Sequence, residues 1–388
     1  MKETSRTGWT RLREILVGPA KDLRDPHITH KLSLIAFLAW VGLGADGLSS
    51  SAYGPEEAYR QLGGHSYLAL PLVLATAATV FIISYAYSKI IEHFPIGGGG
   101  YVVATQLLGK SAGVVSGCAL LVDYVLTITV SIAGGGDALF SLLPLSFHKY
   151  KLLIEYAAII FLLLLNIRGV KESVTFLVPL FLTFVATHVL LIGGGVVGHL
   201  FDLPPLVRNV QAGFSSGVAQ VGGWGLFLIF IRAYSLGGGT YTGIEAVSNG
   251  IGIFREPKVA TGKRTMLYMA VSLALTAAGL LLCFMLTDVR SVEGQTLNAS
   301  LGYSLAGGIH LFGLPVGSWF VMVLMFSEAL LLFIAAQTGF IGGPRVMANM
   351  ATDSWLPRRF AGLSDRLSMQ NGVLLIGGAA MLLLYYTQ

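Results

Sequence analysis

The chain has 388 residues, of which 54% are hydrophobic and only 12% are charged, and its mean hydropathy is +0.72. Soluble domains carry about 25% charged residues, and no soluble fold has enough interior to bury this much apolar surface. The composition therefore excludes a soluble protein and a disordered chain, and it predicts a polytopic membrane protein. The net charge of +5 does not indicate nucleic-acid binding, because the basic residues are spread over short connections between apolar segments.

Nine apolar segments are long enough to cross a bilayer core, which a helix of about 20 residues spans. Their expected ranges are 32–60, 66–91, 112–143, 152–167, 173–198, 224–253, 264–287, 315–341 and 371–388, of which the first and the sixth are interrupted. A polar segment, 1–31, comes before the first span. Within it, residues 9–16 are expected either as a short helix on the membrane surface or as part of a solvated tail.

The basic residues predict which side each connection faces, because cytoplasmic loops are enriched in Lys and Arg. With the N-terminus inside, 19 of the 25 Lys and Arg residues lie in the N-terminal segment and the even-numbered connections. Five lie on the opposite side, and Arg232 falls within a span. We therefore expect segment 1–31 to be cytosolic and the N-terminus to be cytoplasmic.

Two spans carry glycine runs with one acidic residue in mid-membrane: 41–55 contains Asp46, and 235–245 ends on Glu245. Glycine disfavours helix, and unwound backbone inside a bilayer is tolerated only where it lines a cavity or binds something. Interrupted helices at matching positions of two halves indicate a secondary transporter with inverted repeats and a site at the midplane. Close helix packing by glycine is the alternative interpretation, but it leaves the two acids unexplained.

The two breaks are five spans apart, an odd number, so the second set of helices should be inverted relative to the first. The sequence thus predicts a first repeat at 32–198, an extracellular connection at 199–223 and a second repeat at 224–388. The second repeat has four spans where the first has five. We expect that its fifth helix is missing because the chain is cut there.

Acidic residues inside the membrane are costly, by about 2.5–3.5 kcal/mol at a helix centre, and they indicate function. The deepest three are Asp46, Asp123 and Glu245. A buried carboxylate can act as a cation ligand or as a proton carrier. In the third span, Asp123 shares one helical stripe with Tyr124, Thr127 and Ser131, which are three and four residues apart. These oxygen ligands suit alkali or alkaline-earth ions, although either hydroxyl alone could simply bond back to its own helix.

Other polar residues in the spans have less specific interpretations. Asp137 is expected at a turn or rim. Glu328 is expected at a gate, in a proton path or in an interhelical salt bridge, for which Arg232 is a candidate partner. His188 is interpreted as a packing histidine rather than a proton relay. Cys118 and Cys283 form neither a metal-binding spacing nor a disulfide framework, and no catalytic constellation is found, so the chain is not expected to be an enzyme.

Several motifs resemble the amino acid–polyamine–organocation (APC) superfamily. They are the interrupted first helix, Gly243-Ile244-Glu245 in the sixth, the basic loop Arg255-Glu256-Pro257-Lys258, and 344–353 with Trp355-Leu356-Pro357 after the eighth span. Within the superfamily, the stretch 44–57 is similar to that of the KimA-type bacterial potassium–proton symporters of the KUP group. The resemblance covers nearly the whole chain, and its most specific part is the first-helix motif.

The resemblance implies an all-α integral membrane protein with a LeuT-like five-plus-five inverted repeat, here cut after about nine spans. It also implies a homodimer in a bacterial plasma membrane, with the ion site between helices one, three and six. Carried over by position, the potassium-site residues are Asp46, Tyr53, Asp123, Tyr124, Thr127, Ser131 and Thr242, with Glu245 as the proton-coupling residue. The sequence departs from the family pattern where the tenth helix, which contributes a site tyrosine, and a cytosolic domain would follow.

Three functions follow from these residues. The first is proton-coupled potassium uptake by alternating access, with potassium and protons as the transported species and no cofactor. The second is a proton-coupled amino acid permease, because helix N-termini at the breaks can hold a substrate carboxylate; Asp46 argues against it by placing negative charge where that carboxylate would dock. The third is a non-transporting sensor or defective paralogue, suggested by the missing helices.

Overall fold

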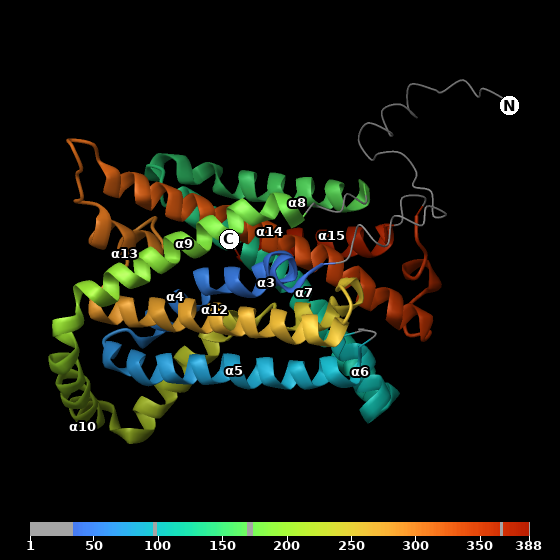
Figure 1. Cartoon of the computed structure of the whole chain (residues 1–388), viewed down its shortest axis with the longest axis horizontal. Coiled ribbons are helices and arrows are strands. Elements are labelled where there is room, and N and C mark those ends of the chain that lie inside the picture. Colours follow the sequence, from blue (N-terminus) through green and yellow to red (C-terminus); the bar gives the residue numbers. More distant parts are fainter. Residues whose placement is uncertain (1–33, 96–98, 169–173, 365–367, 388) are drawn as a thin grey trace.

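The computed structural model describes residues 34–95, 99–168, 174–364 and 368–387 (Figure 1). These residues are almost entirely helical, and the only β pairing among them is at isolated bridges. The expected surface helix at 9–16 lies outside the described residues.

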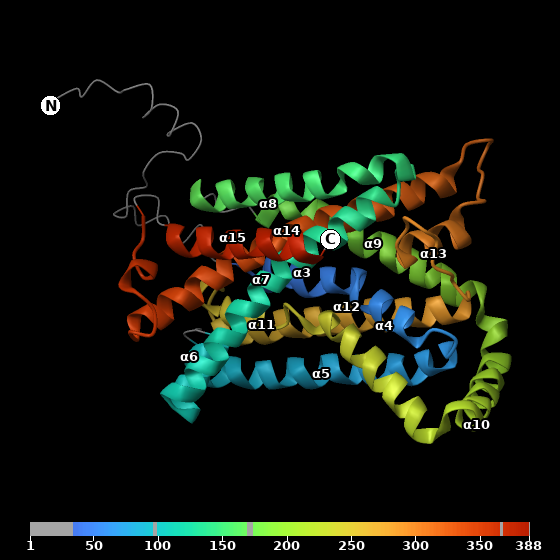
Figure 2. The ribbon, with the colours of Figure 1, turned by 180° about the vertical axis from the view of Figure 1, so that it is seen from behind.

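Most of the long helices run in roughly the same direction, as the opposite views of Figures 1 and 2 show. Their bounds are α3 (Ala36–Ser49), α4 (Gly54–Leu62), α5 (Ala69–His93), α6 (Gly99–Leu108), α7 (Lys110–Phe140), α8 (Lys151–Arg168), α9 (Val174–Gly198), α10 (Leu203–Leu236), α11 (Glu245–Asn249), α12 (Lys258–Leu286), α13 (Leu297–Ala306), α14 (Val316–Thr352) and α15 (Gln370–Thr387). Short 3₁₀ turns connect several of them, and two of these, η1 (Ser50–Ala52) and η5 (Gly237–Tyr241), lie at the expected breaks.

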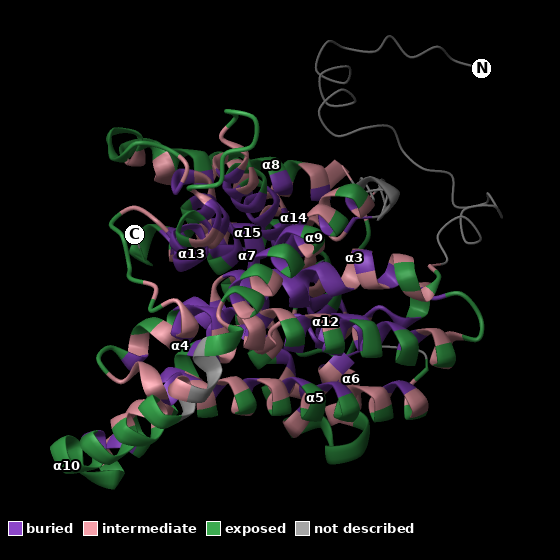
Figure 3. Ribbon diagram, turned by 60° about the vertical axis from the view of Figure 1, so that its left-hand side comes forward, coloured by how far each residue is buried: buried purple, intermediate pink, exposed green. Residues whose placement is uncertain are grey.

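The prediction of an all-α membrane protein is confirmed. Eight helical segments of the described residues are long and apolar enough to cross a membrane. The ninth predicted segment is the first span of the chain. It is split into α3 and α4, and neither helix alone is long enough to cross a membrane. Large apolar side chains such as Leu74, Phe161 and Leu275 are exposed on the outside of the bundle. Figure 3 shows the buried residues gathered in the interior, with exposed ones along the outer helices.

Two regions have more helix than the sequence pattern indicated. The segment 199–223, expected as a connection, contains the start of α10, which continues through a kink at Gly222 (φ 76°) into the sixth span. The connection after α12 contains α13, whose N-cap Thr296 accepts a hydrogen bond from the amide of Ala299 at 3.2 Å. Such capping stabilises a helix start, and it fixes a polar helix end beside the first-helix break.

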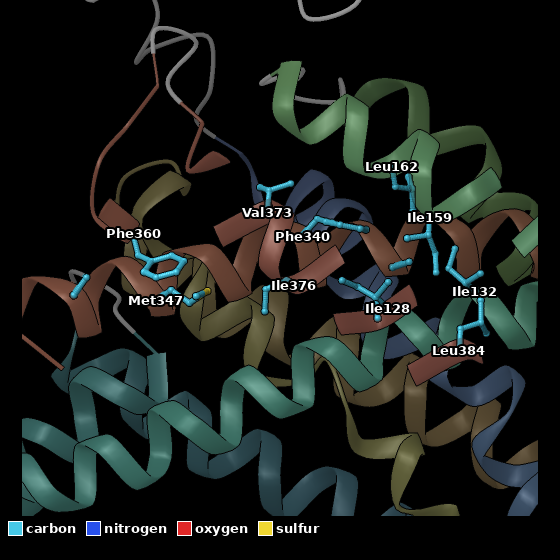
Figure 4. Close-up of a cluster of buried hydrophobic side chains, with 13 residues drawn as sticks. Ile128, Ile132, Ile159, Leu162, Phe340, Met347, Phe360, Val373, Ile376 and Leu384 are labelled. Carbon is cyan, nitrogen blue, oxygen red and sulfur yellow. The ribbon is translucent and has the colours of Figure 1, made fainter. Parts of the chain in front are cut away.

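One large apolar cluster joins α7, α8, α14 and α15 (Figure 4). Ile128 and Ile132 of α7 meet Ile159 of α8, Phe340 of α14 and Leu384 of α15 there. Lipid tails are as apolar as these side chains, so close van der Waals packing is what joins the helices here. The cluster therefore holds α7 and α14 in fixed register, and α7 carries the polar stripe of the candidate site.

The two interrupted helices are tied to each other at their ends. The amide of Leu34 donates to the carbonyl of Ile253, and the amide of Arg255 donates to the carbonyl of Leu34, both at 2.9 Å. Between these ends, α11 packs against α3 and α5. The start of the first span and the end of the sixth are thus fixed side by side.

Candidate functional site

Hydroxyl groups join the interrupted helices where their backbone unwinds. The Tyr53 hydroxyl lies 3.2 Å from Oγ1 of Thr242, and Ser50 Oγ donates to the carbonyl of Thr240 at 2.8 Å. Thr242 Oγ1 also donates to the carbonyl of Gly239 at 2.8 Å. The carbonyls freed by the glycine run η5 therefore find side-chain partners instead of helical ones, as backbone polar groups in a bilayer require.

Gly243 allows the two breaks to approach each other. Its φ is +82°, a conformation that L side chains rarely adopt. A Cβ at this position would overlap the amide nitrogen of Gly47 and the carboxyl carbon of Asp46. Backbone of the sixth span therefore lies directly against Asp46, a contact that only glycine permits.

We expect Gly243→Ala to destabilise the protein and to abolish ligand binding at this junction. The left-handed conformation alone costs about 1–2 kcal/mol, and the overlap of the new Cβ with Gly47 and Asp46 would push the two breaks apart. Gly238→Ala is the matched control: this glycine lies in the same run, has ordinary φ, and has open space where the Cβ would go. Thermal unfolding of both purified variants would check this. Equal melting temperatures would contradict the assigned contact.

Three carboxylates converge on this junction. Asp46 is only 4% exposed and Glu245 is 9% exposed, whereas Asp123 is half-buried. Asp46 is repelled electrostatically by both Glu245 and Asp123, and Glu245 by Asp123. The Glu245 carboxylate accepts hydrogen bonds from backbone amides of its own residue and of Gly243. Buried like charges of this kind are unstable unless a cation or a proton compensates them.

The stripe on α7 is buried as expected. Tyr124, Thr127 and Ser131 are each 6% exposed or less. Neither Thr127 nor Ser131 bonds back to its own helix among the described residues, in contrast to Thr129, which donates to the carbonyl of Val125 at 2.9 Å. The interpretation of simple back-bonding therefore fails for the two candidate ligands.

The candidate residues do not all meet at one point. The stripe from Asp123 to Ser131 extends about 12 Å along α7 at 1.5 Å per residue. Tyr53 lies beside Gly134 at one end of it. Tyr124, at the other end, accepts a hydrogen bond from Nδ2 of Asn249 at 3.0 Å. Both tyrosines interact electrostatically with all three carboxylates, so each end of the stripe lies within range of these charges.

Two residues of this region were missed in the sequence. Asn249 lies one helical turn after Glu245, a spacing that could have pointed to it. Tyr87 of α5 interacts electrostatically with Glu245 and Asp123, but nothing in the pattern of α5 marks it. No group of three or more His, Cys, Asp or Glu residues with metal-binding geometry occurs among the described residues, and both cysteines are free thiols.

The remaining polar residues are also placed. Asp137 lies near the end of α7 and pairs with Lys151 at 2.5 Å, in the rim position expected for it. The expected partner of Glu328, Arg232, was wrong: Arg232 is exposed, and Glu328 lies 3.6 Å from His188 instead. The two facing elements are α9 and α14, which pack together. His188 also stacks on Phe184, as a packing histidine does.

Two comparisons relate the chain to known proteins. A family model described as amino acid permease matches residues 41–387. Potassium transporter KimA of Bacillus subtilis (strain 168) is 33% identical over 359 residues, which cover 91% of this chain and 56% of that protein. The chain thus spans about half the length of this curated relative.

Proposed function

We propose that this chain, which belongs to the amino acid permease family, transports potassium ions across the membrane and couples this movement to protons. The observation that carries the proposal is the mutual electrostatic repulsion of Asp46, Asp123 and Glu245, beside the close approach of Gly243 to Asp46 at the junction of the interrupted helices. Three carboxylates in one largely buried region require positive charge to compensate them. A substrate amino acid would bring its own carboxylate into the same negative region.

The similarity to a potassium transporter supports potassium as that charge. Carboxylate, hydroxyl and carbonyl oxygens are hard ligands, which alkali cations prefer over soft donors. The cation would be held by Asp46, Asp123 and Thr242, with further oxygens from Tyr53, Tyr124, Thr127 and Ser131. Because these groups extend along α7, we propose that the ion passes between positions rather than resting at a single one.

Glu245 is proposed to couple the proton. It is buried at the unwound segment of the sixth span and is repelled by Asp123. Binding a proton there and binding a cation at the neighbouring carboxylates would depend on each other, because each removes part of the same repulsion. Such dependence between two ligands is what coupling requires.

The architecture supports transport by alternating access. Two interrupted helices meet in the middle of the bundle, the arrangement that inverted-repeat transporters use for their binding sites. We propose the same repeat organisation here, a bacterial plasma membrane location with the N-terminus inside, and a homodimeric full-length protein. The membrane potential would favour inward movement by about 2.3 kcal/mol per charge per 100 mV.

The first test is growth rescue of a bacterial strain that lacks its potassium importers, with the complete gene. We expect wild type to restore growth at low potassium and Asp123→Asn to lose it, because the variant removes a charge at the junction. Asp353→Asn is a useful comparison, since Asp353 lies beyond the end of α14 and accepts a hydrogen bond from Tyr101. No rescue by wild type despite verified membrane expression would overturn the proposal in favour of an amino acid permease, to be tested next by labelled amino-acid uptake.

A further inference from the structure

A second buried pair of titratable groups lies away from the three carboxylates. Glu328 is in the middle of α14 and His188 is in α9, and each is 1% exposed. The His188 Nε2 atom lies 3.6 Å from Oε2 of Glu328. On its other side, the imidazole ring stacks on Phe184 with a centroid separation of 3.8 Å. The ring is therefore fixed in orientation toward Glu328.

Hydrogen bonding fixes which nitrogen of His188 carries a hydrogen. Nδ1 of His188 lies 2.9 Å from the carbonyl oxygen of Phe184. A carbonyl only accepts, so Nδ1 must carry its hydrogen. A neutral imidazole would then point the lone pair of Nε2 at the carboxylate, an unfavourable arrangement for a buried charge. A hydrogen on Nε2, which has no hydrogen-bond partner among the described residues, would instead face Glu328 favourably.

One member of the pair borders a cavity. Glu328 lines a cavity of about 290 Å³, which we call the vestibule, together with Tyr53 of the candidate site. His188 does not line the vestibule. A proton entering from the vestibule would thus meet Glu328 before His188.

Asn298 connects this pair to the first-helix break. Its Nδ2 atom donates to Oε2 of Glu328 at 3.0 Å and to the carbonyl of Ala52 at 3.1 Å. Ala52 is the last residue of η1 and directly precedes Tyr53. A second link joins the same elements, because the amide of Leu297 donates to the carboxylate of Glu56. Helix α13 therefore clamps the break against α14.

We propose that Glu328 and His188 form a proton-binding site, distinct from Glu245, that controls the clamp between Asn298 and the first-helix break. A hydrogen bond to an ionised carboxylate is roughly twice as strong as one to a neutral group. A proton, taken up from the vestibule, neutralises Glu328 and weakens the hydrogen bond that Asn298 donates to it. Acidification of the vestibule therefore frees Ala52 and Tyr53 to move. The role in transport rests on the function proposed above; the proton site itself does not.

Other charged groups lie around Glu328 and the vestibule. Glu56 interacts electrostatically with Glu328 and pairs with Arg60. The others are the vestibule residues Glu57, Asp137, His148 and Glu293, and Lys151, which pairs with Asp137. Among these groups, Glu56 is the buried one that interacts with Glu328 directly. The test must therefore separate Glu328 from the vestibule acids.

The protonation of Glu328 can be measured without any transport. We expect pH-difference infrared spectra of the purified full-length protein to contain a carboxylic acid band that is missing in Glu328→Gln. In His188→Gln the same band should titrate in a different pH range. Glu293→Gln, an exposed vestibule residue, should keep the wild-type band. Identical spectra for wild type and both pair variants would overturn the proton site.

The clamp is tested by rubidium exchange at equal pH on both sides, which requires no net proton movement. Over the pH range in which the band titrates, exchange by wild type should rise on acidification. In Glu328→Gln and Asn298→Ala this pH-dependent change should be at least threefold smaller, whereas Asn298→Ala should retain the infrared band. An unchanged pH profile in Asn298→Ala would refute the clamp. Absence of exchange in wild type, with the band intact, would count against the transport function alone.

Discussion

Replacing Asp46 by Asn should weaken potassium or rubidium binding by at least about 100-fold while leaving the fold intact. Removing one partner of a buried charge interaction costs about 3–5 kcal/mol, and each 1.4 kcal/mol is a factor of ten in affinity. Asn has nearly the same volume as Asp, so the packing of Gly243 against this residue is kept. The change therefore removes charge and little else.

Thermal stability separates loss of binding from loss of folding in this variant. Without potassium, Asp46→Asn should melt at or above the wild-type temperature, because it removes repulsion from Glu245 and Asp123. Added potassium should raise the melting temperature of wild type only, since a ligand stabilises the state that binds it.

Asp288→Asn is the matched control, because Asp288 is exposed in the loop after α12 and its left-handed φ of 45° also suits Asn. A variant at Asp46 that keeps the full stabilisation by potassium would remove this residue from the site.

Replacing Glu245 by Gln should leave rubidium uptake responsive to membrane potential but insensitive to an imposed pH gradient. If one proton moves with each cation, one pH unit is worth 1.36 kcal/mol, or about a tenfold change in steady-state accumulation. Wild-type proteoliposomes should show this change. The variant should show almost none, because its amide cannot exchange a proton.

The control for this experiment is Glu256→Gln, in the loop between the sixth span and α12, whose side chain is 79% exposed. It should respond to the pH gradient like wild type. A Glu245→Gln variant with a full tenfold response would show that the coupling proton binds elsewhere, and the pair of Glu328 and His188 would then be the next place to look.

Much of the fold could be read from the sequence because it depends on local composition. Continuous apolar runs specify membrane helices wherever they occur. The glycine runs beside Asp46 and Glu245 predicted the two breaks because each is combined with an acid in mid-membrane, whereas the glycine runs at 134–136 and 193–195 stay helical in α7 and α9. The stripe on α7 follows from helical periodicity alone. These features needed no knowledge of how the helices pack.

The choice of partners was decided only by the tertiary structure. Glu328 pairs with His188 and not with Arg232, and Tyr124 bonds to Asn249, because helix packing brings these residues together across long stretches of chain. Likewise, Asn298 contacts Ala52 only because α13 folds back onto the first-helix break. Periodicity along one helix sets which face a residue occupies, whereas the identity of the facing residue depends on the position and register of another helix. For this reason the sequence determined which residues were available to the site, and the packing of α7, α9, α13 and α14 decided which of them meet.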